Sequence, residues 1–124
     1  MTKDQVSKYA VAWRQREERE RQEAEALRKE ALKEARKAVL ELARDFRIRK
    51  AVLFGSVLAP GRFRKDSDID IAVEGLSAGD FWKACGRMME HDFEIDLKPL
   101  EDLKGLIRER VDKGEVIYER PEGG

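Results

Sequence analysis

Residues 51–73 read AVLFGSVLAPGRFRKDSDIDIAV and contain the pattern that decides the fold. The run from Ala51 to Phe54 is apolar and ends at Gly55-Ser56, which predicts a buried strand followed by a tight turn. A basic loop over 57–67 comes next, and residues 68–73 then alternate polar and apolar side chains, as a half-buried strand does. The two segments therefore predict two strands of one sheet.

The rest of the domain adds strands and helices to this pair. Residues 93–97 alternate in the same way and predict a third strand, and 115–118 is a candidate edge strand. Helical patterns cover 78–90 and 101–113. The inward side of the first of these helices is predicted to hold large side chains, namely Phe81, Trp82, Cys85, Met88 and Met89. The predicted fold class is α/β (α+β), with a small mixed β-sheet flanked by helices.

The N-terminal third predicts one long helix. Strong helix formers fill the chain from Lys3 to Arg44, without Pro or Gly. Apolar residues at 32, 35, 39, 42 and 46 form one stripe that can face a core. Near the N-terminus, Val6, Tyr9 and Trp13 have no such domain beside them, and we expect them to pack on another chain. The predicted division is an extended helical arm over 1–37, a domain over 38–120 and a disordered tail over 121–124.

Composition restricts the classes of function. The 124 residues suit one domain, and 26 basic side chains balance 26 acidic ones, so no overall charge favours direct DNA binding. No apolar run is long enough to cross a bilayer. The single Cys85 cannot form an intramolecular disulfide and is interpreted as a structural thiol, and His91 as a capping or surface residue. We expect a cytoplasmic protein without membrane association.

Two carboxylates are the strongest chemical signal. Asp68 and Asp70 are two positions apart on a predicted strand, so both side chains should point to one face. Such a pair is costly unless a cation lies between the carboxylates, and hard oxygen ligands suit Mg²⁺. Asp96, on the third predicted strand, adds another carboxylate. Three such groups on one sheet face predict a site for two metal ions.

The turn after the first strand predicts a phosphate site. Gly55 lets the backbone approach a ligand closely, and N–H groups with the Ser56 hydroxyl can face a phosphate. Arg62 and Lys65, on the loop that follows, are candidates for neutralising the rest of a triphosphate. The pattern as a whole predicts a combined metal and phosphate site.

Three short motifs resemble those of the minimal nucleotidyltransferases (MNT) of the polymerase beta superfamily. In order along the chain they are Phe54-Gly55-Ser56, Asp66-Ser67-Asp68-Ile69-Asp70 and Glu94-Ile95-Asp96. The resemblance implies that Gly55 and Ser56 hold nucleotide phosphates, and that Asp68, Asp70 and Asp96 bind Mg²⁺ and perform catalysis. The loop after Ser56 departs from the family's usual pattern, because it is about one residue longer and has no Arg before its Gly.

The resemblance also implies a biological role. Many minimal members pair with a HEPN-type toxin as its antitoxin, and some transfer AMP from ATP to a hydroxyl of that toxin. A HEPN-type toxin is therefore the expected partner, with a homo-oligomer through the N-terminal helix as a further expectation. The alternative is a non-catalytic binding module that neutralises a protein by occlusion. Transfer to a small molecule ranks last, since the chain lacks an extra domain to enclose one.

Overall fold

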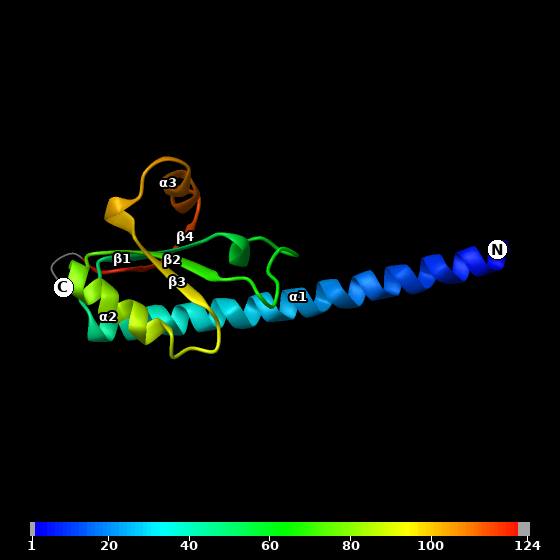
Figure 1. Ribbon diagram of the computed structural model, residues 1–124, viewed down its shortest axis with the longest axis horizontal. Coiled ribbons are helices and arrows are strands. Elements are labelled where there is room, and N and C mark those ends of the chain that lie inside the picture. Colours follow the sequence, from blue (N-terminus) through cyan, green and yellow to red (C-terminus); the bar gives the residue numbers. More distant parts are fainter. Residues whose placement is uncertain (1, 122–124) are drawn as a thin grey trace.

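The computed structural model describes residues 2–121, which form a small sheet with helices on both faces (Figure 1). Its order along the chain is α1 (Lys3–Asp45), β1 (Lys50–Phe54), the 3₁₀ turn η1 (Ser56–Leu58), β2 (Ile69–Glu74), α2 (Ala78–Met88), β3 (Ile95–Pro99), the 3₁₀ turn η2 (Leu100–Asp102), α3 (Gly105–Asp112) and β4 (Glu115–Glu119). The predicted tail residues 122–124 lie outside the described part.

The sheet is mixed, as the sequence predicts. Its strand order is β3-β2-β1-β4, with β1 antiparallel to both β2 and β4, and β2 parallel to β3. The segment predicted as an edge strand is the edge strand β4. Helices α1 and α2 cover one face, and α3 lies over the other (Figure 1).

Period-2 alternation divides the strands between two apolar clusters. Ile69 and Ile71 of β2 point to the face under α1 and α2 and are fully buried there. Phe54 and Ala72 point to the other face and pack with Val111 of α3. This second cluster is much smaller, so part of the α3 face is left to polar side chains.

Helix α1 is the longest element and extends well beyond the sheet. It starts in a capping box, in which Thr2 and Gln5 exchange side-chain to backbone hydrogen bonds of 2.9 and 3.2 Å. One face of its second half, formed by Ala31, Ala35, Ala38, Val39 and Leu42, is buried on the domain, while the N-terminal half projects past it (Figure 1). The apolar stripe predicted for the second half is confirmed. No helix of residues 2–121 is long and apolar enough to cross a membrane.

The prediction for the inward side of α2 is wrong at two positions. Ala84 and Met88 are buried, whereas Trp82 is 72% exposed and Met89 is 86% exposed. Successive helical residues are rotated by about 100°. Consequently, the sequence neighbours Phe81 and Trp82, or Met88 and Met89, cannot both face the sheet.

Several element boundaries also differ from the prediction. The third strand starts at Ile95 rather than at 93, and the last helix starts at Gly105 rather than at 101. Leu100 is buried against the α3 face, which requires the chain to turn through η2 directly after β3. Gly105 has a φ of +69°, and this turn of the backbone reorients the chain into α3.

His91 is a buried bridge rather than a surface residue. Its side chain is 7% exposed and contacts two carboxylates of α1, with Nδ1 at 2.5 Å from Glu34 and Nε2 at 3.0 Å from Glu41. Burial opposes the charged form, but the hydrogen bonds and charges of Glu34 and Glu41 outweigh it and raise the pKa of His91. The bridge fastens the segment after α2 to α1.

Candidate active site

Asp70 and Asp96 lie side by side on the α3 face of the sheet. They are register partners in the parallel pair of β2 and β3, so their side chains point the same way. Ile69 and Leu97, next to them in sequence, are buried on the opposite face. The alternating pattern of both strands thus brings the two predicted carboxylates together.

Asp68 joins this face from just outside the strand. The prediction placed it within the strand, but β2 begins at Ile69 and Asp68 is exposed before it. The hydrogen bond from the Ile69 N–H to the Glu94 carbonyl (2.8 Å) shows that pairing begins only at residue 69. Asp68 is still close enough for its charge to act on Asp70. We call Asp68, Asp70 and Asp96 the acidic face.

The pKa of Asp70 is shifted by its surroundings on the acidic face. Partial burial, then the charges of Asp96 and Asp68, raise the pKa of Asp70, while Lys98 and Arg110 oppose the rise. Two cations that the sequence analysis did not select therefore act on this site. The ammonium of Lys98 lies 3.0 Å from Asp96 Oδ2.

Gly55 brings the turn against the acidic face. It has a φ of +85°, and a Cβ at this position would overlap Oδ2 of Asp70. Only glycine permits this contact, because any side chain would displace the carboxylate. The structure thus brings Gly55 together with Asp70, as the combined metal and phosphate site requires.

Ser56 begins the 3₁₀ turn η1 directly after Gly55. The turn is closed by hydrogen bonds from Leu58 N–H to the Gly55 carbonyl (3.1 Å) and from Ala59 N–H to the Ser56 carbonyl (3.0 Å). The first N–H groups of such a turn have no acceptor inside it, so they are suited to an anion. Ser56 itself is partly exposed.

Arg28 of α1 supports this turn from the other side of the sheet. Its guanidinium donates to the Val57 carbonyl at 3.1 Å and is held by Glu25 through two bonds of 2.9 and 2.7 Å. The hydrogen bonds that Arg28 donates to the Glu25 carboxylate raise the pKa of Arg28. No sequence signal distinguishes Arg28 from the other arginines of the helix, since the contact spans 29 positions.

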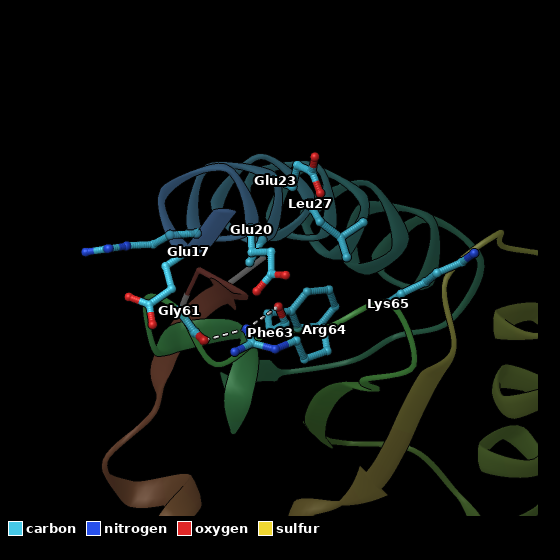
Figure 2. Close-up of a pocket in the computed structure, with 10 residues that line it drawn as sticks. Glu17, Glu20, Glu23, Leu27, Gly61, Phe63, Arg64 and Lys65 are labelled. Atoms are coloured by element: carbon cyan, nitrogen blue, oxygen red, sulfur yellow. Dashed lines mark hydrogen bonds between the residues drawn. The ribbon is translucent and has the colours of Figure 1, made fainter. Parts of the chain in front are cut away.

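The structure places Lys65 beside α1 rather than on the acidic face, and Arg62 is not among the charges that shift the pKa of Asp70. Arg62 is exposed, and Lys65 lines a cavity of about 670 Å³ between α1 and the loop after η1. Figure 2 shows Glu17 and Glu20 reaching from α1 toward that loop, with Phe63 and Arg64 beneath them. None of the acidic-face residues lines this cavity.

Lys98 and Arg110 are the basic residues whose charges lower the pKa of Asp70. Lys98 could be found from the sequence, because it follows Asp96 by two positions on a predicted strand and so shares its face. Arg110 could not be found in this way. Its effect on Asp70 depends on how α3 packs across the sheet, and nothing local determines that.

The acidic face fits Mg²⁺ in the kind of donor it offers. Its oxygen donors are hard, and its central carboxylate is partly desolvated among like charges, a cost that a bound cation would remove. As the side chains stand, no three acidic, histidine or cysteine groups within residues 2–121 are gathered closely enough to enclose an ion. Side-chain rotation, including release of Asp96 from Lys98, is needed to complete such a site.

The fold and these residues together define a class of protein. The family model described as polymerase beta, nucleotidyltransferase, matches residues 36–123. The chain therefore belongs to this nucleotidyltransferase family, as the resemblance implied. None of the curated proteins matches the chain.

Solved structures of toxin-antitoxin proteins share the fold. One, described as a toxin-antitoxin with AMP-PNP, is 24% identical, with a TM-score of 0.57, over 70% of this chain and 75% of that one. A mutant of the toxin-antitoxin MntA-HpeT with two Asp-to-Glu changes is 22% identical, with a TM-score of 0.55 over the same shares. The toxin-antitoxin MntA-HepT is 23% identical, with a TM-score of 0.51 over 68% and 70%.

Proposed function

We propose that this protein is a metal-dependent nucleotidyltransferase that transfers a nucleoside monophosphate, AMP from ATP, to a hydroxyl group of a partner protein. The observation that carries the proposal is the contact between Gly55 and Asp70. It joins a turn suited to phosphate with a carboxylate suited to a metal, and phosphoryl chemistry needs both within one site.

The proposed metal ligands are Asp68, Asp70 and Asp96, for two Mg²⁺ ions. When bound, Mg²⁺ would supply positive charge that neutralises a triphosphate and polarises its reacting phosphorus. The N–H groups after Gly55 and the Ser56 hydroxyl would hold phosphate oxygens. Lys98 and Arg110 are placed to add positive charge at the same face, and Arg62 and Lys65 remain candidates only if their loop moves.

Asp96 is the proposed base. Its side chain is 44% exposed, so an acceptor hydroxyl can approach it from solvent. A carboxylate oxygen of Asp96 would accept the proton of that hydroxyl as its oxygen attacks the α-phosphorus of ATP. The bond from that phosphorus to the pyrophosphate oxygen breaks, and pyrophosphate leaves.

The proposed partner is a HEPN-type toxin, with this chain as its antitoxin. The support is the shared fold with the toxin-antitoxin structures, one of which is described with the ATP analogue AMP-PNP. In another, two aspartates two positions apart are replaced by glutamate, a spacing that matches Asp68 and Asp70 here.

A second candidate function is neutralisation of a partner by occlusion without chemistry. The pairing of Lys98 with Asp96 favours it, because the ammonium occupies an oxygen that a metal ion would need. In that case the arm and the edge of the sheet would bind the partner, and the acidic face would be vestigial.

One experiment separates the two functions. The protein is incubated with Mg²⁺, ATP labelled at the α-phosphate and the protein encoded by the adjacent gene, and binding is measured in parallel. We expect label on the partner, and its loss in a variant with Asp68→Asn and Asp70→Asn. Asp66→Asn is the matched control, since Asp66 is exposed in the turn before β2. Equal partner binding by all variants, with no label in any, would establish occlusion instead.

A further inference from the structure

The arm presents a patch of apolar side chains that stay largely exposed within residues 2–121. Val6, Tyr9 and Trp13 are 52%, 70% and 60% exposed, although they are large apolar or aromatic side chains. Residues three and four apart share one face of a helix, so the three form a single patch. We call Val6, Tyr9 and Trp13 the arm patch. A patch of this kind on a charged helix indicates a binding surface.

The arm patch lies on the same side of α1 as the cavity beside the loop. A helix turns by about 100° per residue, which places Val6, Trp13, Ala24 and Leu27 within an arc of about 60°. Ala24 and Leu27 line the cavity, together with Phe63 from the loop. The patch and the cavity are thus two parts of one continuous face, separated by the charged turn that contains Glu17 and Glu20.

The arm patch and the cavity are complementary in shape and in apolar character. The arm patch offers protruding aromatic side chains, and the cavity offers about 670 Å³ with an apolar floor at Leu27 and Phe63. The same chain therefore carries a projection and a recess on one helix face. A helix from a second copy, running antiparallel, would insert its patch into this cavity and receive the first copy's patch in its own. Such an isologous contact closes on itself as a dimer.

Charge favours the antiparallel direction. The outer end of α1 is basic, with Lys3, Lys8 and Arg14 against Asp4. The segment over 17–30, which flanks the cavity, has a net charge of −2, because Arg19, Arg21, Arg28 and Lys29 offset part of its six glutamates, Glu17, Glu18, Glu20, Glu23, Glu25 and Glu30. Antiparallel pairing places the basic end of one arm beside the acidic segment of the other, whereas parallel pairing would place like charges together.

We propose that this protein forms a two-fold dimer in which the α1 helices pair antiparallel and the arm patch of each copy fills the cavity between α1 and the loop of the other. The midpoint between patch and cavity falls near Glu17, which places the two-fold axis there. Ala10 of one copy then lies beside Ala24 of its partner. The dimer does not depend on the proposed function, because no acidic-face residue takes part.

The oligomeric state tests the dimer directly. Sedimentation of the full chain should give twice the mass of one chain, and Tyr9→Glu with Trp13→Glu should give the mass of one. Val11→Glu is the matched control, because Val11 is 49% exposed on the opposite side of the same arm and its variant should remain dimeric. Circular dichroism verifies that each variant keeps its helix. A single-chain mass for the unaltered protein, or equal dissociation by Val11→Glu, would overturn the proposal.

Disulfide trapping tests the direction in a Cys85→Ser background. Glu17→Cys should link to itself, since it lies near the axis. Ala10→Cys should not link to itself but should link to Ala24→Cys when the two variants are mixed. Self-linking of Ala10→Cys would indicate parallel helices, and linking only in the presence of another protein would indicate a different occupant; either result overturns the proposal.

Discussion

The carboxylate of Asp70 lies directly against the backbone of Gly55, at the point where the first strand turns into η1. This contact joins the turn after β1 to a carboxyl group whose pKa is raised by partial burial and by the charges of Asp96 and Asp68. The geometry of the candidate site therefore depends on a position without a side chain, and substitution at that position is the most direct test of it.

Gly55→Ala should both destabilise the protein and disrupt the site. It adds a Cβ that overlaps Asp70 and forces a non-glycine residue to a positive φ, at a combined cost on the order of 1–3 kcal/mol or more. Gly61→Ala is the matched control, since Gly61 also has a positive φ (+79°) but has open space around its Cβ position. Urea unfolding of both variants measures the difference. Equal losses of stability would mean that the contact with Asp70 has no energetic importance.

Asp70→Asn should stabilise the metal-free protein while it weakens the response to Mg²⁺. The substitution removes the central charge from a partly desolvated group of like charges. Mg²⁺ should raise the Tm of the unaltered protein. At a Mg²⁺ concentration of 100 times its Kd, the free energy of unfolding should increase by about 2.7 kcal/mol. Asp66→Asn, outside the acidic face, should leave both quantities unchanged. Thermal unfolding with and without Mg²⁺ measures both effects. If Mg²⁺ raised the Tm of Asp70→Asn as much as that of the unaltered protein, Asp70 would not be a metal ligand.

Lys98→Met should increase Mg²⁺ affinity in the absence of nucleotide. The ammonium of Lys98 occupies Asp96 Oδ2, and a partly exposed ion pair of this kind is worth at most about 1 kcal/mol, or roughly fivefold in affinity. Isothermal titration with Mg²⁺ gives the value, with Lys104→Met, at an exposed position before α3, as control. Unchanged affinity would show that Lys98 does not compete with the metal.

Arg28→Gln should loosen the turn at Ser56. The substitution removes the donor to the Val57 carbonyl and the partner of the Glu25 carboxylate. Leaving a partly buried acceptor without its hydrogen-bond donor lowers the free energy of unfolding by about 1–3 kcal/mol. Arg36→Gln, whose pair with Glu115 is exposed and 3.6 Å long, should cost less than about 1 kcal/mol. Hydrogen exchange at residues 56–59 should rise only in the Arg28 variant. Similar exchange in both would show that Arg28 does not support the turn.

Stability should fall as pH rises, through His91. Its pKa is raised in the folded state by Glu34 and Glu41, despite burial, so the stabilisation is fully present below the ordinary histidine pKa. It is lost as pH increases through the raised value. Urea midpoints measured from mildly acidic to alkaline pH should show this decline in the unaltered protein and a flatter profile in His91→Gln. An identical decline in the variant would assign the pH dependence to other groups.

Local patterns in the sequence predicted the strands and the acidic face because both follow from period-2 alternation. Asp70 and Asp96 share a face whatever the helices do, provided that their strands pair. The family match agrees with the fold that these motifs predicted.

Features that depend on tertiary packing could not be predicted in the same way. Trp82 and Met89 have the composition of core residues, yet α2 turns them to solvent. Arg28 and Arg110 resemble the other charged residues around them, and only the packing of α1 and α3 gives them their contacts. His91 likewise becomes a bridge only because two glutamates of a distant helix approach it.

The absence of any break in α1 links two regions that are far apart. Between Lys3 and Asp45 the helix contains neither glycine nor proline, so its sequence offers no position at which a sharp kink is expected. Arg28, partway along that helix, holds the backbone beside Ser56. In the proposed dimer, the second copy that binds the outer end of α1 would therefore also act, through Arg28, on the turn that begins at Ser56.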